Sequence, residues 1–427
     1  MTPEDIKRLN YIRYSSFRSF VKNPHNLIVC YILFIMKYLG GFLFFRAKRK
    51  FLGEVLFCAF TINNRKSIGT ITENLSSISH TIWDSRKHDL PMGEILLNSI
   101  KHFSLFQRFY NASSREDRKL IRTFYESFMA TSGCYEAYDK ILKDNPQLKL
   151  IVFANDHSIE NRCLLEIAAK HGVKTLYVQH ASITERFPPL HFTYSFLDGM
   201  ESFKKYKAIG DMKGTIFLTG SPRFDELYKY KGATKTHDIG IALNQLDSCD
   251  KVMELCKYLQ DNTSQRIIVR PHPRMGNLFD AQLFRKHGID ISDSTQESSF
   301  SFLSKVKFLI ANESSIHLDS ALIGVPSFLY NFSDHKILDW YSYIKKGLIQ
   351  VCDNFDDVMM VIKRQQELPV DKIQYYNSSW DTPIEGNVGA FIADFITSLI
   401  SSSEEEALNK IDAVIEERNG YFTIRKN

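Results

Sequence analysis

The stretches RIIVRPHPR (residues 266–274) and VKFLIANESSIHLDSALIGVPSFLYN (residues 306–331) decide the fold. Each stretch begins as an apolar run of strand length and then passes directly into polar residues or a helical pattern. Strands that alternate with helices of about 10–15 residues are typical of parallel α/β sheets. Such open sheets bind their ligands outside the carboxyl ends of the strands. The two stretches therefore predict an α/β domain with a ligand site where these strands end.

The residues that follow the two strands predict a site for a phosphorylated ligand. They bring guanidinium groups, an imidazole and hydroxyls to one edge of the sheet, and guanidinium groups bind phosphate through paired hydrogen bonds. The helix after the second strand adds backbone N–H groups and the positive end of its dipole. The predicted residues are Arg270, His272, Arg274, Asn312, Glu313, Ser314 and Ser315.

Length and charge bound the organisation of the chain. At 427 residues it exceeds one ordinary core, so two domains are expected. Ten Lys and Arg but only two acidic residues lie in residues 1–50, whereas the rest of the chain is mildly acidic. A nucleic-acid-binding surface is therefore not expected on the folded domains. The seven cysteines are scattered and form no CxxC pair, which favours a reduced, cytoplasmic chain without a zinc site.

Residues 27–45 (LIVCYILFIMKYLGGFLFF) are almost wholly apolar and are followed by the basic cluster 46–50. About 19 apolar residues are just enough to cross a bilayer, but Lys37 and the Gly40-Gly41 pair weaken that interpretation. No cleavage site of a signal peptide follows. Three alternatives remain: a helix on the membrane surface, a buried helix and a true span. The basic flanks favour the first, at an anionic cytoplasmic leaflet.

The alternation of apolar and polar segments divides the chain into four parts. They are an N-terminal helical arm (1–50), a Rossmann-like domain (51–230), a second Rossmann-like domain (237–400), and a C-terminal helix and tail (401–427). In the first domain, residues 51–60 are expected to form a strand, and residues 71–82 the helix after it. A polar segment over residues 228–238 is the expected linker.

Strand ends in the first domain carry further candidate residues. Asp156 follows the strand pattern of residues 148–155, and it is either a catalytic base or a helix N-cap. His180 follows the next strand and is either catalytic or a hydrogen-bonded loop histidine. The segment Gly220-Ser221-Pro222-Arg223 ends a third strand, where glycine allows a ligand to approach the backbone closely. We expect Gly220, Ser221 and Arg223 to contact the ligand.

The order of these motifs resembles the GT-B glycosyltransferases of bacterial capsule, lipopolysaccharide and teichoic acid synthesis. The motifs are a QH strand end, TGSPRFDEL, RPHPR, NESSIHLDSALIGVPSFLYN and DWYSYIKKGLIQVCDNFDDVM, within residues 50–400. The His-Pro motif followed by Ser-Ser is similar to that of the bacterial sialyl-, polysialyl- and Kdo transferases, which use CMP-sugars. The layout also resembles the CDP-glycerol glycerophosphotransferases. The resemblance implies two Rossmann-like domains with a cleft between them.

The resemblance also implies roles and partners. Asp156 matches the catalytic base by position, although Asn-Asp-His stands where those families carry an acidic pair and a glycine. His180 is the alternative base, and His272 would donate to the phosphate of a nucleotide-sugar. No metal and no cofactor are expected. The acceptor would be a growing glycan or glycolipid. The chain would work in the cytoplasm, bound through residues 1–50 to the inner face of the bacterial cell membrane.

Other functions fit the same motifs. One alternative is a CDP-glycerol- or CDP-ribitol-type polyol phosphotransferase of teichoic-acid-like polymers, which transfers a phosphate ester in place of a sugar. Another is an isomerase, since UDP-N-acetylglucosamine 2-epimerases share the fold and an element like GSPRFD. A third is a non-catalytic carbohydrate-binding protein on the same fold. The donor that the chain binds distinguishes the first two from a CMP-sugar transferase.

Overall fold

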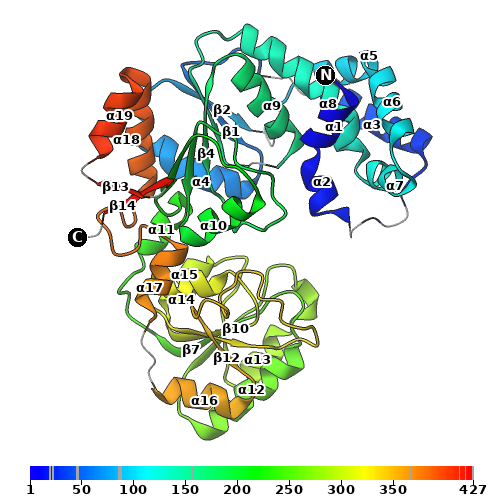
Figure 1. Cartoon of the computed structure of the whole chain (residues 1–427). Helices are drawn as coiled ribbons and strands as arrows, with labels where there is room; N and C mark the ends of the chain where they lie inside the picture. The colour runs from blue at the N-terminus through cyan, green and yellow to red at the C-terminus, as the bar shows by residue number, and fades with distance from the viewer. Residues whose placement is uncertain are drawn as a thin grey trace. The chain divides into compact units, whose positions relative to one another are not determined.

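The computed structural model describes residues 1–18, 21, 24–44, 48–84, 89–155, 157–364, 368–412, 414–418 and 420–425. It consists of two compact units (Figure 1). Unit 1 comprises Met1–Arg223 and Asn387–Asn427, and unit 2 comprises Phe224–Gly386. Each unit is built on its own mainly parallel sheet with helices on both faces, so each is a Rossmann-like domain.

Unit 1 contains a sheet in the order β13-β14-β6-β5-β4-β3-β1-β2. The strands are β1 (Val55–Ala59), β2 (His80–Asp84), β3 (Leu150–Phe153), β4 (Lys174–Val178), β5 (Tyr194–Leu197), β6 (Thr215–Leu218), β13 (Ile415–Arg418) and β14 (Tyr421–Ile424). Every pair is parallel except β13–β14. The strand order reverses between β1 and β3, which is the switch point where such sheets bind ligands.

Helices cover both faces of this sheet. They are α1 (Pro3–Leu9), α2 (Tyr11–Ser15), α3 (Leu27–Phe44), α4 (Ile62–Glu73), α5 (Met92–Lys101), α6 (Phe103–Ala112), α7 (Arg115–Thr123), α8 (Tyr125–Lys143), α9 (Ile159–Lys170), α10 (Met200–Ile209), α18 (Val388–Ser401) and α19 (Glu404–Ile411). Because neighbouring side chains of a strand point to opposite faces, the core has two layers. Tyr177 of β4 contacts Tyr206 of α10, whereas Tyr194 of β5 contacts Phe395 of α18.

The first 44 residues are part of unit 1, and their described residues show no separate arm. Ile6 and Leu9 of α1 lie in the core, as do Cys30, Phe34 and Tyr38 of α3. The expected arm over residues 1–50 is corrected accordingly, because these apolar side chains pack against the helical layer of the sheet. None of the described helices combines the length and apolarity that crossing a membrane requires. Phe45 and Arg46 lie outside the described residues.

Two predicted elements differ from the structure. Residues 62–73 form α4, and residues 80–84 form β2, where a helix over 71–82 was expected. The helix starts earlier because Thr61 caps it: the Thr61 hydroxyl accepts from the N–H of Asn64 at 3.1 Å, and the Asn64 side chain bonds back. At the other end, residues 415–424 form a hairpin, which the expected helix and tail over 401–427 did not include.

The last helix and hairpin belong to unit 1, whereas the predicted second domain extended to residue 400. Phe395 of α18 packs on the rings of Tyr194 and Phe217, with centroids 5.2 and 5.4 Å apart. Strand β14 extends the sheet by pairing with β6, and Phe422 stacks on Phe217 at 5.5 Å. These aromatic contacts explain why the chain after Gly386 returns to unit 1.

Unit 2 contains a wholly parallel sheet in the order β12-β11-β10-β7-β8-β9. The strands are β7 (His237–Ala242), β8 (Ile267–Arg270), β9 (Asp290–Ile291), β10 (Val306–Ala311), β11 (Ser327–Tyr330) and β12 (Gln350–Cys352). Read along the sheet, this is the Rossmann order 3-2-1-4-5-6, with its switch point between β7 and β10. The alternation of strands and helices that the sequence predicted between residues 239 and 330 is confirmed.

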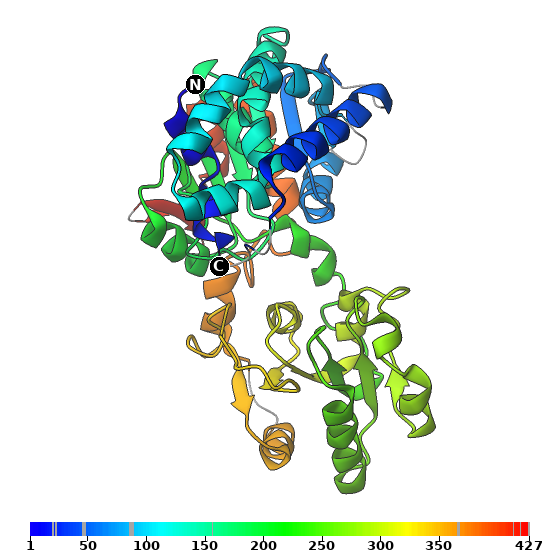
Figure 2. The same ribbon diagram turned by 90° about the vertical axis from the view of Figure 1, so that its right-hand side faces the viewer.

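Helices and short turns cover both faces of the second sheet. They are α11 (Asp225–Tyr228), α12 (Cys249–Asn262), the turn Gly276–Leu278, α13 (Ala281–Lys286), α14 (Ser299–Ser304), α15 (Ile316–Leu322), α16 (Phe355–Arg364) and α17 (Val370–Tyr376). One apolar core joins α11, α14, α15 and α17 to the sheet, and a second core joins α12, α13 and α16 to it. Helices α12 and α16 are drawn green and orange at the foot of Figure 2.

Candidate functional site

Asn312 organises the carboxyl edge of the second sheet at its switch point. It follows β10 and is buried, and its Nδ2 donates to Oδ1 of Asp247 at 2.7 Å and to Oδ1 of Asn331 at 3.1 Å. Its own Oδ1 accepts from the N–H of Glu313 at 2.8 Å. Asp247 lies in the loop after β7, and Asn331 follows β11. Asn312 therefore holds three strand-end loops in place around the position where a ligand is expected.

His272 is oriented as a neutral hydrogen-bond donor. Its Nδ1 accepts from the backbone N–H of Arg274 at 3.1 Å, which assigns the ring hydrogen to Nε2. Burial, and then the guanidinium of Arg274, lower the pKa of His272. Because the ring is half-buried and its pKa is lowered, it is neutral at pH 7. The Nε2–H of His272 is thus suited to donate to an anionic oxygen.

The two guanidinium groups of the RPHPR segment differ in environment. Arg270 is buried and donates to Oγ of Ser292 at 2.8 Å and to the carbonyl of Glu297 at 2.7 Å. These bonds tie the end of β8 to the loop after β9. Arg274 is exposed. Of the two arginines predicted to bind phosphate, Arg270 therefore maintains the fold, and Arg274 is the one open to a ligand from solvent.

Ser314 and Ser315 lie between β10 and α15. Both are half-buried, and the Ser314 hydroxyl accepts from the N–H of Ile316 at 3.4 Å. Ser315 is the residue before the helix, and its side chain makes no capping bond there. The Ser315 hydroxyl is therefore not used to cap α15, and the Ser314 hydroxyl makes only one long local bond.

Glu313, a predicted donor-binding residue, fixes the turn of residues 338–340. Its carboxylate accepts from the backbone N–H of Leu338, at 2.9 Å, and from that of Trp340. Between them, Asp339 adopts a φ of 51°, which is rare for a residue other than glycine. Trp340 is 60% exposed. In the sequence, this turn belongs to the aromatic segment DWYSY, which contributed to the family resemblance. Here it places an exposed indole on a turn fixed to the edge of the sheet.

The carboxyl edge of the first sheet carries the candidate base residues. Asp156 lies outside the described residues. Its neighbour Asn155 is buried, and the Asn155 Oδ1 accepts from the N–H groups of His157 and Ser158 at 2.9 and 3.0 Å. The rings of His157 and His180 are 6.3 Å apart between centroids. The ends of β3 and β4 thus bring two imidazoles together, of which the sequence singled out His180 alone.

Asp198, which follows β5, is a buried carboxyl that sequence reasoning missed. Its Oδ2 lies 3.7 Å from Nη2 of Arg223. Burial raises the pKa of Asp198 to about 7, and Arg223 and Ser221 oppose that shift. Its backbone N–H donates to Oε1 of Gln179 at 2.9 Å, and the Ser221 hydroxyl donates to the Gln179 carbonyl at 3.3 Å. The available signal was its position: an acidic residue directly after a buried strand.

The predicted site residues fall into two groups. Gly220, Ser221 and Arg223 belong to unit 1, with His180, whereas the other predicted donor-binding residues belong to unit 2. Gly220 adopts a φ of +78°, so the turn after β6 requires the left-handed conformation that glycine tolerates. Ser221 and Arg223 are tied to Gln179 and Asp198. Their contacts therefore fix the strand ends of unit 1.

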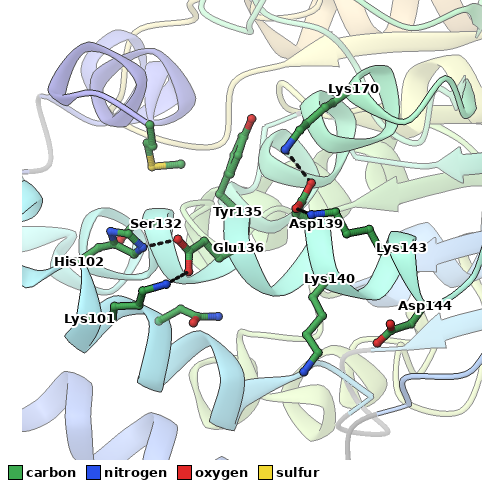
Figure 3. A pocket seen from close by; sticks show the side chains of 12 residues that line it. Lys101, His102, Ser132, Tyr135, Glu136, Asp139, Lys140, Lys143, Asp144 and Lys170 are labelled. Atoms are coloured by element: carbon green, nitrogen blue, oxygen red, sulfur yellow. Dashed lines mark hydrogen bonds and ion pairs between the residues drawn. The ribbon is translucent and has the colours of Figure 1, made fainter.

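A hollow of about 500 Å³ lies elsewhere, among the helices of unit 1 (Figure 3). Its walls come mainly from α5 and α8, and its charged groups pair with each other. Glu136 pairs with Lys101 at 3.3 Å, and Asp139 pairs with Lys143 at 2.5 Å and with Lys170 at 2.8 Å. Three of the four lysines that line the hollow are thus already paired with carboxylates.

Within the described ranges, no group of three or more His, Cys, Asp or Glu side chains is arranged to hold a metal ion. The seven cysteines are all free thiols.

Comparison with known proteins assigns the fold. The sequence matches no protein-family profile, and no curated protein matches it either. Among solved structures, UDP-GlcNAc 2-epimerase from Methanocaldococcus jannaschii is similar, at a TM-score of 0.51 and 12% identity over 81% of this chain and 99% of that one. The chain therefore shares the fold of this enzyme. The Neisseria meningitidis UDP-GlcNAc 2-epimerase bound to UDP-GlcNAc gives a TM-score of 0.51 at 10% identity, over 82% and 100% of the two chains. The wall teichoic acid polymerase TagF gives a TM-score of 0.45 at 11% identity, over 88% of this chain and 99% of that one.

Proposed function

We propose that the chain is a transferase that takes a sugar from a nucleotide-activated donor, with a CMP-sugar favoured. Its product would be a growing capsule or lipopolysaccharide glycan. The observation that carries the proposal is the position and state of His272. A neutral imidazole, with Nε2–H as its donor, follows β8 beside the switch point of a Rossmann-ordered sheet. Ligands of such sheets bind at that point.

The chemistry of the donor explains why a neutral donor is useful there. When the bond from sugar to phosphate breaks, negative charge develops on the oxygens of the leaving nucleotide phosphate. Fixed hydrogen-bond donors stabilise that charge more in the transition state than in the bound donor, which lowers the barrier. We assign this role to the Nε2–H of His272, with Arg274 supplying a positive charge. The hydroxyls of Ser314 and Ser315 would bind the remaining phosphate oxygens.

The acceptor hydroxyl requires a base, because its own pKa lies far above neutrality. We propose Asp156 or His180 for this role; His180 follows β4 at the carboxyl edge of the first sheet. The second imidazole, His157, lies beside His180 and would help to hold it. The reaction forms a glycosidic bond to the acceptor oxygen and releases the nucleotide, and the hydroxyl proton passes to the base.

We propose that Trp340 binds the nucleobase. Its indole is exposed, and its backbone is fixed by Glu313, the residue after Asn312 at the switch point. An exposed aromatic ring beside a phosphate site is a stacking platform for any base, and such stacking contributes roughly 1–3 kcal/mol. This role accounts for the strained φ of Asp339, which sets the direction in which the turn presents Trp340.

We further propose that the chain works at the inner face of the bacterial cell membrane, where a glycan or glycolipid acceptor is anchored. The excess of basic residues in residues 1–50 supports this location.

The test is a thermal-shift titration of the full chain with CMP, CDP, UDP, GDP and ADP. A ligand that binds the folded protein raises its melting temperature by mass action. We expect a shift with CMP that is lost in the His272→Ala variant and kept in His287→Ala, a matched change at an exposed histidine of unit 2. A shift with UDP alone would contradict the CMP-sugar proposal and favour a UDP-sugar enzyme, such as an epimerase.

Phosphorus NMR of the products then separates the alternatives. A sugar transferase given a CMP-sugar releases CMP and leaves no phosphorus in the polymer. A polyol phosphotransferase given CDP-glycerol also releases CMP, but its product carries a phosphodiester. An epimerase given UDP-N-acetylglucosamine releases no nucleotide.

A further inference from the structure

One side of α3 is exposed and almost wholly apolar. The exposed fractions of its large side chains run from 40% to 72% on that side. These residues are Ile28, Ile32, Ile35, Met36, Leu39, Phe42 and Leu43. They recur at intervals of three and four, so they form one stripe along the helix. A surface helix of a soluble domain normally carries polar residues there.

The opposite side of the same helix is also apolar, and it is buried. Cys30, Phe34 and Tyr38 pack into the core of unit 1. That packing orients the helix and leaves the other stripe facing outward. The apolar side chains on the outer side of α3 are therefore not part of the core that holds unit 1 together.

The exposed stripe continues onto the neighbouring helices α5 and α6, which lie beside α3 (Figure 1). Leu97, Ile100 and Phe103 are exposed there. The helices approach closely: a Cβ placed on Gly93 of α5 would lie 2.3 Å from the Phe42 ring. Farther along, the rings of Tyr31 and Phe103 are 4.9 Å apart. The apolar face is defined as the exposed side chains of α3 together with Leu97, Ile100 and Phe103.

Several cations lie beside the apolar face. Residues 21–50 contain six Lys and Arg and no acidic residue. Lys48, Arg49 and Lys50 follow α3, and Arg49 pairs with Glu94 in the first turn of α5. Lys101, which follows Ile100, is likewise exposed and pairs with Glu136 at 3.3 Å. A broad apolar surface with cations at its rim is complementary to an anionic lipid bilayer.

We propose that the apolar face docks on an anionic lipid bilayer, with α3 lying in the plane of the interface. The inference rests on the proposed membrane location but not on the proposed transfer chemistry. It identifies α3, α5 and α6 as the surface that makes the contact. A second copy of the chain fits less well, because pairing two such faces would bring their basic rims together.

The experiment measures binding of the full chain to lipid vesicles by co-sedimentation. The vesicles contain phosphatidylcholine alone or with phosphatidylglycerol, at low and high salt. The test variant is Met36→Glu/Leu43→Glu, which changes two largely exposed side chains and leaves the buried stripe intact. The matched control is Leu246→Glu/Leu278→Glu, at exposed apolar positions of unit 2. Thermal unfolding confirms that each variant is folded, and size-exclusion chromatography with light scattering reports its oligomeric state.

We expect the wild type to bind the vesicles that contain phosphatidylglycerol, and to bind less at high salt. The partition coefficient should fall about tenfold or more in the α3 variant, because two apolar side chains no longer enter the bilayer. The control should bind like the wild type. Equal binding of the α3 variant, or no wild-type binding to either vesicle, would overturn the inference. So would a wild-type dimer that the α3 variant converts to a monomer, since the face would then be a subunit interface. The nucleotide shift is measured without lipid, so the two proposals fail independently.

Discussion

The buried carboxyl of Asp198 makes the stability of unit 1 depend on pH. Burial raises its pKa from the ordinary 3.8 to about 7 in the folded protein. A raised pKa means that the folded state holds a proton that the unfolded chain has released. The stability from this group is therefore complete below pH 3.8 and is lost as the pH rises through 7. Replacing Asp198 with Asn keeps the shape of the neutral acid but removes the titration.

The size of the effect follows from the two pKa values. One pKa unit corresponds to about 1.4 kcal/mol, so the complete loss is about 4 kcal/mol. Between pH 5.5 and pH 8, the folded carboxyl passes from almost wholly protonated to almost wholly ionised. Over that interval the wild type should lose about 2 kcal/mol relative to Asp198→Asn. The unfolding free energy of Asp198→Asn should therefore rise relative to that of the wild type as the pH rises. This holds although the variant lacks the carboxylate that faces Arg223.

The assay is urea unfolding of both proteins at pH 5.5 and pH 8. Trp340→Phe and Trp380→Phe are introduced into both, so that the fluorescence of Trp83, which is fully buried in unit 1, reports on that unit alone. The quantity compared is the difference in unfolding free energy between variant and parent at each pH, which cancels the titration of all other groups. If this difference is the same at both pH values, or moves against the variant, Asp198 is ionised in the folded protein and the reasoning fails.

Three further predictions concern other positions. Burial lowers the pKa of His317 to about 4, so protonation of the unfolded chain should cost the wild type about 2 kcal/mol between pH 7.5 and pH 5. Urea unfolding should show a smaller loss of stability between pH 7.5 and pH 5 in His317→Gln than in the wild type. An equal loss in both proteins would refute the lowered pKa of His317. Trp340→Ala should raise the dissociation constant of the bound nucleotide about tenfold, and Trp340→Phe less, by calorimetry; equal affinities would exclude stacking. Gly93→Ala should destabilise unit 1 by about 1–3 kcal/mol, because its Cβ would meet Phe42. Combining it with Phe42→Ala should cost less than the two single changes together, and additive effects would contradict the contact.

The sequence predicted most of the second unit because local and global signals agree there. Most of its strands are short apolar runs, and most of the helices follow a turn that contains Gly, Pro or Asn. The strand that ends in Arg270 and the strand that ends in Ala311 were placed within a residue of their observed ends. The same pattern put His272 and Ser315 at the carboxyl edge of the sheet, where the structure has them.

The first unit was predicted less completely, because its signals conflict. The segment before Glu73 contains no apolar period of helical spacing, so the helix was predicted over residues 71–82 instead. The capping box that Thr61 forms at the start of α4 was not used in that prediction. The hairpin of residues 415–424 pairs with a strand about 200 residues earlier, and such pairing leaves no local signal. The apolar run of α3 could not reveal which of its sides would be buried, since both sides carry the same residue types.

The roles of individual site residues depended on contacts that a sequence does not contain. Arg270 and Arg274 look alike in the motif, yet one is buried against Ser292 and the other is exposed. In the sequence, Asp198 is simply the first residue of an Asp-Gly pair after a strand. Its burial and its distance of 3.7 Å from Arg223 appear only in the structure.

The central claim is that a nucleotide binds at the switch point of the second sheet, between the end of β8 and the start of α15. Hydrogen-exchange mass spectrometry of the full chain, with and without saturating CMP, tests it most directly. Backbone amides of residues 270–275 and 312–316 should exchange more slowly with the nucleotide present, and this protection should be lost in His272→Ala. Protection confined to residues 98–144, around the hollow between α5 and α8, would contradict the claim. Protection of neither region by CMP or by UDP would contradict it equally.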